Sequence, residues 1–216
     1  MRTVPRVVVH LVRHGEVENP GRLRYGRLPG FGLSPRGHEQ AERAAEYLSR
    51  ATPRVSCVVS SPLERARETA DAIARRTGGR EVLVDERVIE AASRFDGLPR
   101  VFAPHLYLRR HAETLGRDVH ETPFVVATRM RDALADLASR AQSDGNAAIA
   151  VVTHQLPIQY VRHLFAASDP SAWLERLRWQ IGWVPKSRCD HASITTVTFE
   201  DARVVSVEYV EPRVAG

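Results

Sequence analysis

Short apolar runs alternate with amphipathic stretches along most of the chain. Four runs are flanked by turn residues and rich in β-branched residues, a pattern typical of strands in a buried sheet. They cover Val7–Val12, Val55–Ser60, Glu81–Asp85 and Ala147–Thr153. The stretches predicted to form helices cover Gly37–Arg50, Pro62–Arg76, Pro123–Ala141 and Pro157–Ala167. Ser34-Pro35 supplies an N-cap and a first-turn proline for the first helix.

Two further segments complete the pattern. Ile194–Phe199 and Val204–Val210 resemble a terminal hairpin, and residues 90–121 have weak periodicity and several glycines and prolines. Alternating strands and helices predict an α/β fold, because crossover helices cover both faces of a parallel sheet. We therefore expect a three-layer αβα domain with a mostly parallel central sheet. A lid-like excursion is expected around 90–121, and residues 1–216 are expected to form a single domain.

Composition argues against several classes of protein. The chain has 216 residues, with 43% hydrophobic and 26% charged residues, which is ordinary for a globular domain. Its apolar runs fall far short of the roughly 20 residues that cross a bilayer, and the N-terminal run is too short for a secretory signal. Cys57 and Cys189 lie far apart, which favours reduced thiols over a disulfide framework. We expect a cytoplasmic protein with no membrane partner.

The charge balance has a local origin. The formal net charge is +5, and Lys186 is the one lysine among 31 basic residues, a skew typical of genome composition. Residues 1–50 hold nine arginines against five acids, and three of these arginines fall in a Gly- and Pro-rich loop, at Arg22, Arg24 and Arg27. This clustering predicts a local basic pocket. A nucleic-acid partner is not expected.

Residues suited to phosphate chemistry follow the predicted strands. Arg13-His14 ends the first strand, Thr153-His154 ends the fourth, and Glu90 begins the excursion after the third. Arg65 lies in the first turn of the helix after the second strand, where helix N-termini attract anions. Ligands of such sheets bind at the carboxyl ends of the strands. Two arginines, two histidines and one carboxyl group therefore predict a phosphate site.

The motifs around these residues carry a family resemblance. They are Leu11-Val12-Arg13-His14-Gly15-Glu16, Tyr25-Gly26, Leu33-Ser34 with Gly37, Ser60-Ser61-Pro62-Leu63 through Arg65-Ala66 to Thr69-Ala70, Glu90 before Phe95-Asp96-Gly97, and Thr153-His154. Arg-His-Gly alone is weak, but all of these in this order are specific. The chain resembles the histidine phosphatase, or phosphoglycerate mutase-like, superfamily over most of its length. The sequence around Asn19-Pro20 and at His154-Gln155-Leu156-Pro157 resembles that of an uncharacterised actinobacterial subgroup.

The resemblance implies a catalytic role for each of five residues. His14 would attack phosphorus and form a phosphohistidine, with Arg13 and Arg65 binding the phosphoryl oxygens. His154 would donate a further hydrogen bond as an imidazolium, and Glu90 would be the general acid and base. Arginines supply the positive charge in this scheme, so no metal and no cofactor are expected. The implied activity is phosphomonoester hydrolysis.

Three positions depart from the family pattern. Val17 stands where a threonine or serine usually follows the first motif, and Gln155 replaces the glycine that usually follows the second histidine. Asn19 is followed by Pro20, whereas the family's asparagine usually lies one residue further along. Asn19 is nevertheless a candidate phosphate ligand. The departures leave the five central roles intact but put the detailed phosphate contacts in doubt.

Alternatives stay open for the acid and for the reaction. Glu86 or Asp85 could replace Glu90 as the acid. A mutase is the second possibility, although residues 89–97 contain nothing like the ERHYG segment of mutases. Arg109-Arg110 is a weak candidate for the second basic site that a mutase needs. A degenerate phospholigand-binding protein is the third. The presence of all five central residues argues against it.

Specificity is expected from loops on the rigid sheet. The candidate substrate-binding residues are Arg22, Arg27, Arg94 and His191. The arginines indicate a small phosphorylated metabolite with negative charge beyond its reactive phosphate, without distinguishing a sugar phosphate from a nucleotide, a phosphoglycerate or a phosphoprotein. A homodimer is the general expectation for a soluble enzyme.

Overall fold

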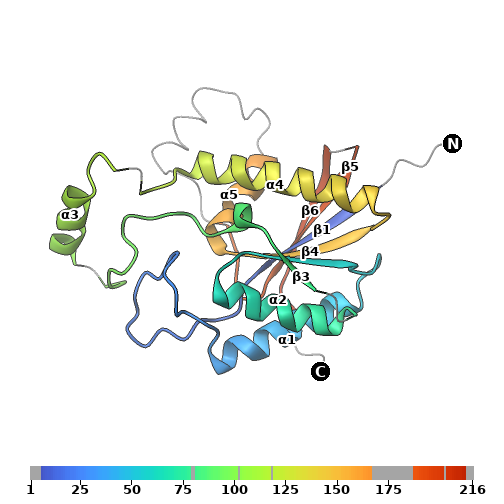
Figure 1. Ribbon diagram of the computed structural model, residues 1–216, viewed down its shortest axis with the longest axis horizontal. Helices are drawn as coiled ribbons and strands as arrows, with labels where there is room; N and C mark the ends of the chain where they lie inside the picture. The colour runs from blue at the N-terminus through green and yellow to red at the C-terminus, as the bar shows by residue number, and fades with distance from the viewer. Residues whose placement is uncertain are drawn as a thin grey trace.

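The computed structural model describes residues 6–78, 81–101, 103–117, 119–166, 187–201 and 203–212 (Figure 1). Its strands are β1 Arg6–Arg13, β2 Cys57–Ser60, β3 Val82–Val84, β4 Ala148–Thr153, β5 Ile194–Glu200 and β6 Arg203–Val210. Its helices are α1 Pro35–Ser49, α2 Glu64–Arg76, α3 Pro104–Glu113, α4 Pro123–Ser143 and α5 Gln155–Ala166, with a 3₁₀ turn at Glu86–Val88.

The strands form one mixed sheet in the order β3-β2-β4-β1-β5-β6. β1 to β4 run parallel, whereas β5 lies antiparallel to β1 and pairs with β6 as the expected hairpin. Arg13 pairs with Thr153, and Ser60 pairs with Val152. Three parallel strands therefore end at one edge of the sheet, and the residues that follow them start side by side.

Helices cover both faces of the sheet, as expected for a three-layer α/β fold (Figure 1). α4 and α5 pack on one face, where Leu11 and Ile149 of the sheet meet Met130, Leu134 and Ile158. α1 and α2 pack on the other face through a second core rich in alanine, which includes Ala41, Ala44, Ala45, Ala66 and Ala70. Small side chains let these two helices lie close to the sheet and to each other.

The first helix packs directly on the loop after β1. Ser34 caps α1 by accepting a hydrogen bond from Gly37 N, and Pro35 follows it as expected. A Cβ at Gly15 would lie 2.4 Å from Gly37 O, and a Cβ at Gly37 would lie 2.0 Å from Glu16 O. Glycine is therefore required on both sides of the contact that holds the turn after His14.

The expected excursion contains α3, which lies at the left of Figure 1, away from the sheet. No residue of α3 is buried, and Leu108 is 70% exposed. The preceding segment is tied to the loop after β1 by backbone hydrogen bonds from Gly97 N to Arg24 O and from Arg100 N to Arg22 O. The excursion thus borders the carboxyl edge of the sheet.

Element ends differ slightly from the sequence expectation. α2 begins at Glu64 rather than at Pro62, and α5 begins at Gln155, so that Pro157 lies in its first turn. β3 is shorter than expected, and Ala167, the expected end of the last helix, lies outside the described residues. Among the helices that are described, none is long and apolar enough to span a bilayer.

Candidate active site

Five predicted residues gather at the carboxyl edge of the sheet. His14 follows β1, His154 follows β4, and Arg13 is the last residue of β1. Arg65 lies in the first turn of α2, and Glu90 follows the 3₁₀ turn after β3. Both imidazole rings are buried, with centroids 5.1 Å apart.

The hydrogen bonds of His14 define its protonation state. Arg65 Nε, which can only donate, lies 3.2 Å from His14 Nε2, so this ring nitrogen accepts. The ring proton is therefore on Nδ1, which donates to Gly15 O across 2.7 Å. Burial, together with His154 and both neighbouring arginines, holds the pKa of His14 well below its ordinary value. The site thus presents a neutral imidazole with an electron pair on Nε2.

Arg65 is fixed by the surrounding loops. Its Nη2 donates to Gly26 O across 2.6 Å, and its guanidinium lies 4.8 Å from the ring centroid of Tyr25. The Thr69 hydroxyl donates to Arg65 O and accepts from Gly15 N. The guanidinium and the turn after His14 are therefore held by one connected set of hydrogen bonds.

The segment before β5 holds Arg13. Nη1 of Arg13 donates to Cys189 O across 2.6 Å, and Nη2 donates to His191 Nε2 across 2.9 Å. Burial and Arg13 lower the pKa of His191 to about 4, which keeps Nε2 free to accept. Arg13 Nε is buried without a hydrogen-bond partner. His191, expected to bind substrate, thus contacts Arg13 in this structure.

His154 bonds to Ser61 and has one unpartnered nitrogen. Nε2 lies 2.7 Å from Ser61 Oγ, and Nδ1 is buried with no hydrogen-bond partner. The expected imidazolium is not favoured, because burial, Arg65 and Arg13 hold the pKa of His154 well below its ordinary value. A neutral ring can still donate from Nδ1 when the Ser61 hydroxyl donates to Nε2.

The pKa of Glu90 is shifted upward, the direction that favours a protonated carboxyl group. Burial raises the pKa of its carboxyl group, against the opposing effects of the Ala91 N–H, Arg65 and Arg13. The Ala91 N–H donates to Glu90 Oε1 across 2.8 Å. The two alternative acids lie elsewhere: Glu86 is exposed, and Asp85 accepts from the backbone and side chain of Arg87. Neither lines the cavity described next.

A cavity of about 500 Å³, here called the His14 cavity, is lined by three of these five residues, Arg13, His14 and Glu90. Arg65 and His154 lie behind its walls. Its walls are formed by Arg13, His14, Arg24, Tyr25, Gly26, Glu90, Ala91, Ser93, Asp96, Arg100, Gln155, Leu156, Gln159 and Tyr160. Neither Arg24 nor Arg100 forms an ion pair with a carboxylate in the described part of the chain. The cavity therefore joins the neutral imidazole of His14, the carboxyl groups of Glu90 and Asp96, and two arginines without a carboxylate partner.

The other predicted residues lie around this cavity rather than in it. Asn19, Arg22 and His191 line a neighbouring cavity of about 360 Å³ that shares Tyr25 and Arg100 with the His14 cavity. The Asn19 amide forms hydrogen bonds in both directions with the backbone of residue 23.

Two predicted arginines form contacts within the protein. Arg27 donates to Glu90 O across 2.7 Å and pairs with Glu121. Arg94 lies 3.1 Å from His111 Nδ1 at the excursion. The basic loop identified in the sequence thus contributes Arg24 to the His14 cavity, and Arg27 to the backbone of Glu90.

Several residues in the His14 cavity or in contact with His154 had no role assigned from the sequence. Asp96 belongs to the quoted Phe-Asp-Gly motif, and burial raises the pKa of its carboxyl group. Gln159 lies one helical turn beyond Gln155, and Tyr160 lies one turn beyond Leu156, so each pair shares a side of the helix. Ser61 belongs to the quoted serine motif, and its contact with His154 depends on the strand register.

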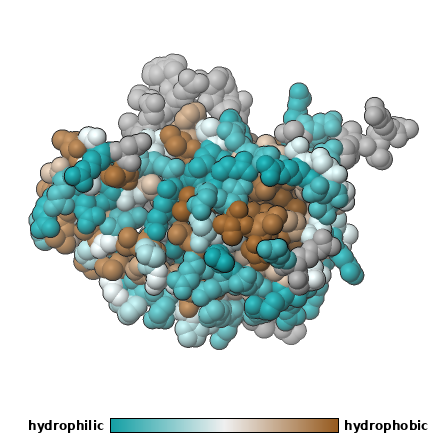
Figure 2. All heavy atoms as spheres, in the orientation of Figure 1, coloured by the Kyte–Doolittle hydropathy of each residue, from teal (hydrophilic) through white to brown (hydrophobic). Residues whose placement is uncertain are grey.

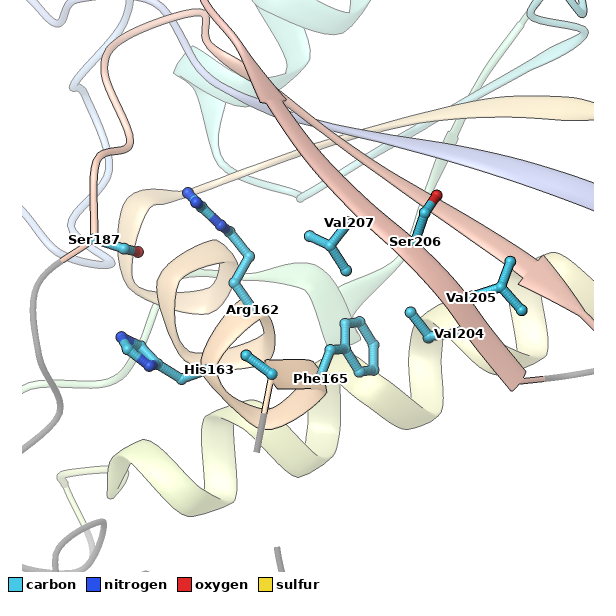
Figure 3. Close-up of a pocket in the computed structure, with 9 residues that line it drawn as sticks. Arg162, His163, Phe165, Ser187, Val204, Val205, Ser206 and Val207 are labelled. Atoms are coloured by element: carbon cyan, nitrogen blue, oxygen red, sulfur yellow. The ribbon is translucent and has the colours of Figure 1, made fainter. Parts of the chain in front are cut away.

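Other places for a ligand or a metal are less suitable. Another cavity, of about 410 Å³, lies between the C-terminal half of α5 and β6 (Figure 3). Arg162, Phe165 and Val207 line it, and its walls at Ala166 and Ser187 adjoin residues outside the described part. Among the described residues, no group of three or more His, Cys, Asp or Glu side chains could hold a metal ion.

Comparison with known proteins identifies the family. A sequence profile of the histidine phosphatase superfamily (branch 1) matches residues 9–212. The chain belongs to the histidine phosphatase superfamily. This superfamily member is 35% identical to the uncharacterised protein Rv0525 of Mycobacterium tuberculosis over 217 residues, which cover 94% of this chain and 96% of that protein. The predicted family and its actinobacterial resemblance are confirmed.

Two named proteins are also similar to this superfamily member. Phosphoserine phosphatase 1 of Hydrogenobacter thermophilus is 29% identical over 203 residues, which cover 90% of this chain and 88% of that protein. The crystal structure of phosphoglycerate mutase from Bacillus anthracis superposes with a TM-score of 0.72 over 96% of this chain and 94% of the other, at 19% identity. The mixed α/β fold is therefore shared with phosphoglycerate mutase-type structures.

Proposed function

We propose that this protein is a metal-independent phosphomonoesterase that works through a phosphohistidine on His14. The hydrogen bond from Arg65 Nε to His14 Nε2 is the observation that carries the proposal, because it leaves the electron pair of a neutral imidazole facing a guanidinium. An oxyanion at phosphorus is stabilised by such fixed donors, which accounts for most of phosphoryl-transfer catalysis.

The first half-reaction transfers the phosphoryl group to His14. The Arg65 Nε–H moves from Nε2 to a phosphoryl oxygen, which frees the electron pair of Nε2. Nε2 then forms a bond to phosphorus as the bond from phosphorus to the ester oxygen breaks, and Glu90 gives its proton to the leaving oxygen. Arg13 and Arg65 bind the phosphoryl oxygens, and His154 donates from Nδ1. The unpartnered Arg13 Nε and His154 Nδ1 support this assignment, because buried donors ordinarily have acceptors.

The second half-reaction releases phosphate. Glu90, now a carboxylate, takes a proton from water as the water oxygen attacks phosphorus. The bond from phosphorus to Nε2 breaks, and its electron pair returns to the His14 ring. Glu90 is then protonated again, so the carboxyl group serves as acid and base in turn.

Hydrolysis is favoured over mutase chemistry. A mutase needs a second phosphate site, and the candidate for that site was Arg109-Arg110. Both arginines pair with Glu113 on α3, and Arg110 also donates to the carbonyl of Asp96. The similarity to a protein named phosphoserine phosphatase supports hydrolysis, whereas the likeness to a named mutase concerns the fold.

We further propose a small phosphorylated metabolite with a second negative group as substrate. Arg24 and Arg100 support this class, because both line the His14 cavity without a carboxylate partner among the described residues. Arg22 would add charge from the neighbouring cavity, and Asn19 would bind phosphate only after exchanging its contacts with residue 23. Arg94 would act from the excursion.

The remaining expectations concern the state of the protein in the cell. We propose a single domain that acts in the cytoplasm without nucleic acid, as a homodimer. The edge strand β3 supports the homodimer, because Leu83 and Val84 are 53% and 50% exposed. Figure 2 shows a hydrophobic area between α2 and α4, where β3 lies in Figure 1.

Trapping of the covalent intermediate tests the proposed function. The protein is mixed with p-nitrophenyl phosphate in EDTA, quenched in base, and analysed for an acid-labile phosphohistidine at His14. We expect turnover and labelling in the wild type and in His38→Ala, an exposed histidine of α1, and neither in His14→Ala. Turnover that needs magnesium or survives in His14→Ala would show the nucleophile to be wrong. Phosphate binding without labelling would indicate a degenerate binding protein.

A further inference from the structure

The segment that carries Glu90 belongs to no helix or strand, although its carboxyl group must be placed accurately. Residues 89–93 are irregular, between the 3₁₀ turn and the excursion. Fixing such a segment costs about 1–2 kcal/mol of backbone entropy per residue, so other contacts must hold it. Side chains from distant parts of the chain provide several of those contacts.

Glu121, which lies just before α4, occupies the centre of these contacts. Its Oε2 accepts from Arg27 Nη2 across 2.5 Å, from Arg129 Nη2 across 3.0 Å, and from Ala92 N across 3.0 Å. Its Oε1 accepts from Arg129 Nε across 3.1 Å. The side chains of Glu121 and Arg129 are 20% and 18% exposed. One carboxylate thus joins two arginines to the Glu90 segment.

Both arginines continue from Glu121 to carbonyl groups of this segment and of the 3₁₀ turn before it. Arg27 Nε donates to Glu90 O across 2.7 Å. Arg129 Nη1 donates to the carbonyls of residues 87 and 89 across 2.6 and 3.1 Å. These side chains therefore bond the backbone on both sides of Glu90. Without the carboxylate between them, the two guanidiniums would face each other uncompensated.

We propose that Glu121, together with Arg27 and Arg129, is a positioning group that holds the acid–base carboxyl of Glu90 over the His14 cavity. The inference rests on the proposed function. It also assigns Arg27 to the protein's own backbone rather than to substrate. Glu121 touches neither the substrate nor the phosphorus in this scheme, and its effect on the reaction passes through Glu90.

The dependence of kcat/KM on the leaving group distinguishes a positioning role from a structural defect that affects all substrates equally. Phenyl phosphate needs protonation of its leaving oxygen more than p-nitrophenyl phosphate does. In Glu121→Gln we expect kcat/KM for phenyl phosphate to fall about 10- to 100-fold, as for a misplaced catalytic group. The same constant for p-nitrophenyl phosphate should fall by less than about threefold, because its phosphorylation step depends little on the acid.

Glu113→Gln is the matched control, because Glu113 also pairs with two arginines but lies on α3 without contact to Glu90. Glu113→Gln should keep the wild-type ratio of kcat/KM for phenyl phosphate to kcat/KM for p-nitrophenyl phosphate. If Glu121→Gln does not show a cooperative thermal transition, Arg129→Lys replaces it in the test and should show the same selective loss on phenyl phosphate. A lysine keeps the charge but cannot reach both Glu121 and the two carbonyls.

An equal loss on both substrates in a folded variant, or no loss, overturns the positioning role. Failure to trap a phosphohistidine in the wild type overturns the proposed function instead. The positioning role is thus tested by substrate dependence in a variant, and the proposed function by trapping in the wild type, so the two failures cannot be confused.

Discussion

Arg65 and His14 are joined through Nε and Nε2 across 3.2 Å, although they lie on different elements. The arginine belongs to α2, and the histidine follows β1. This contact sets the tautomer of the imidazole and places a guanidinium beside the nitrogen that would attack phosphorus. The same arginine is anchored to Gly26 O, so its position does not depend on substrate.

Replacing Arg65 by lysine should therefore impair catalysis although the charge is kept. A lysine cannot donate to His14 and Gly26 O from a planar fork. We expect kcat/KM for p-nitrophenyl phosphate to fall about 10²- to 10³-fold, the usual effect of losing one oxyanion donor. Arg67→Lys, at an exposed position of the same helix, should keep the wild-type rate. Similar rates in the two variants would contradict the assigned role.

The pH dependence should identify the acid. Because burial raises the pKa of Glu90 above its ordinary value of 4.5, kcat/KM for phenyl phosphate should decline as the pH rises beyond that value, which gives the pH profile a descending limb. Glu90→Gln should lower the rate about 10²- to 10⁴-fold and remove the limb. Glu86→Gln should keep both, since Glu86 is exposed outside the cavity. Ionisation of the substrate affects the wild type and both variants alike, so it cannot cause a difference between their pH profiles. Loss of the descending limb in Glu86→Gln rather than in Glu90→Gln would identify Glu86 as the acid.

Buried histidines should make the fold sensitive to acid. Burial lowers the pKa of His10 from its ordinary value of 6.5 to about 4. Between these values the unfolded state binds a proton that the folded state excludes, so stability decreases as pH falls. Each such group contributes up to about 1.4 kcal/mol per pH unit over this range.

Urea unfolding at several pH values tests the contribution of His10. His10→Leu should lose less stability than the wild type between pH 6.5 and about 4, the range between the ordinary and the lowered pKa of His10. His38→Leu, at an exposed position, should follow the wild type. An unchanged slope in His10→Leu would show that this ring does not cause the sensitivity.

The contact between Gly15 and Gly37 should tolerate no side chain. A Cβ at Gly37 would lie 2.0 Å from Glu16 O, a backbone atom, so the turn after His14 would have to move. We expect Gly37→Ala to lose about 1–3 kcal/mol of unfolding free energy and most of its activity. Gly21→Ala is the control, since its Cβ would meet the Leu23 side chain at an ordinary 3.5 Å. Equal stability of the two variants would disprove the steric argument.

The unpaired Arg100 should favour substrates with a carboxylate. 3-Phosphoglycerate and glycerol 3-phosphate differ chiefly in that group. In Arg100→Gln we expect KM to rise about tenfold for the former and little for the latter, as for loss of one charge-assisted hydrogen bond. Arg109→Gln on α3 should change neither, because Arg109 is paired with Glu113. A parallel rise for both substrates would indicate a general effect on phosphate.

The elements and the convergence of the five candidate residues were predictable because their signals are local. Apolar runs define strands, the Ser34-Pro35 pair defines a helix start, and residues at the ends of parallel strands must meet at one edge. That rule brings His14 and His154 together before any coordinates are known. Together with the ordered motifs, it also identifies the family.

Only the tertiary structure decided how those residues are supported. The contacts of Glu121, Arg27 and His191 join segments far apart in the chain, and no local pattern distinguishes a substrate-binding arginine from one that holds a backbone carbonyl. The neutral state of His154 likewise follows from its burial beside two arginines. Desolvation and long-range contacts are properties of the packed fold, whereas periodicity and motif order are properties of the chain itself.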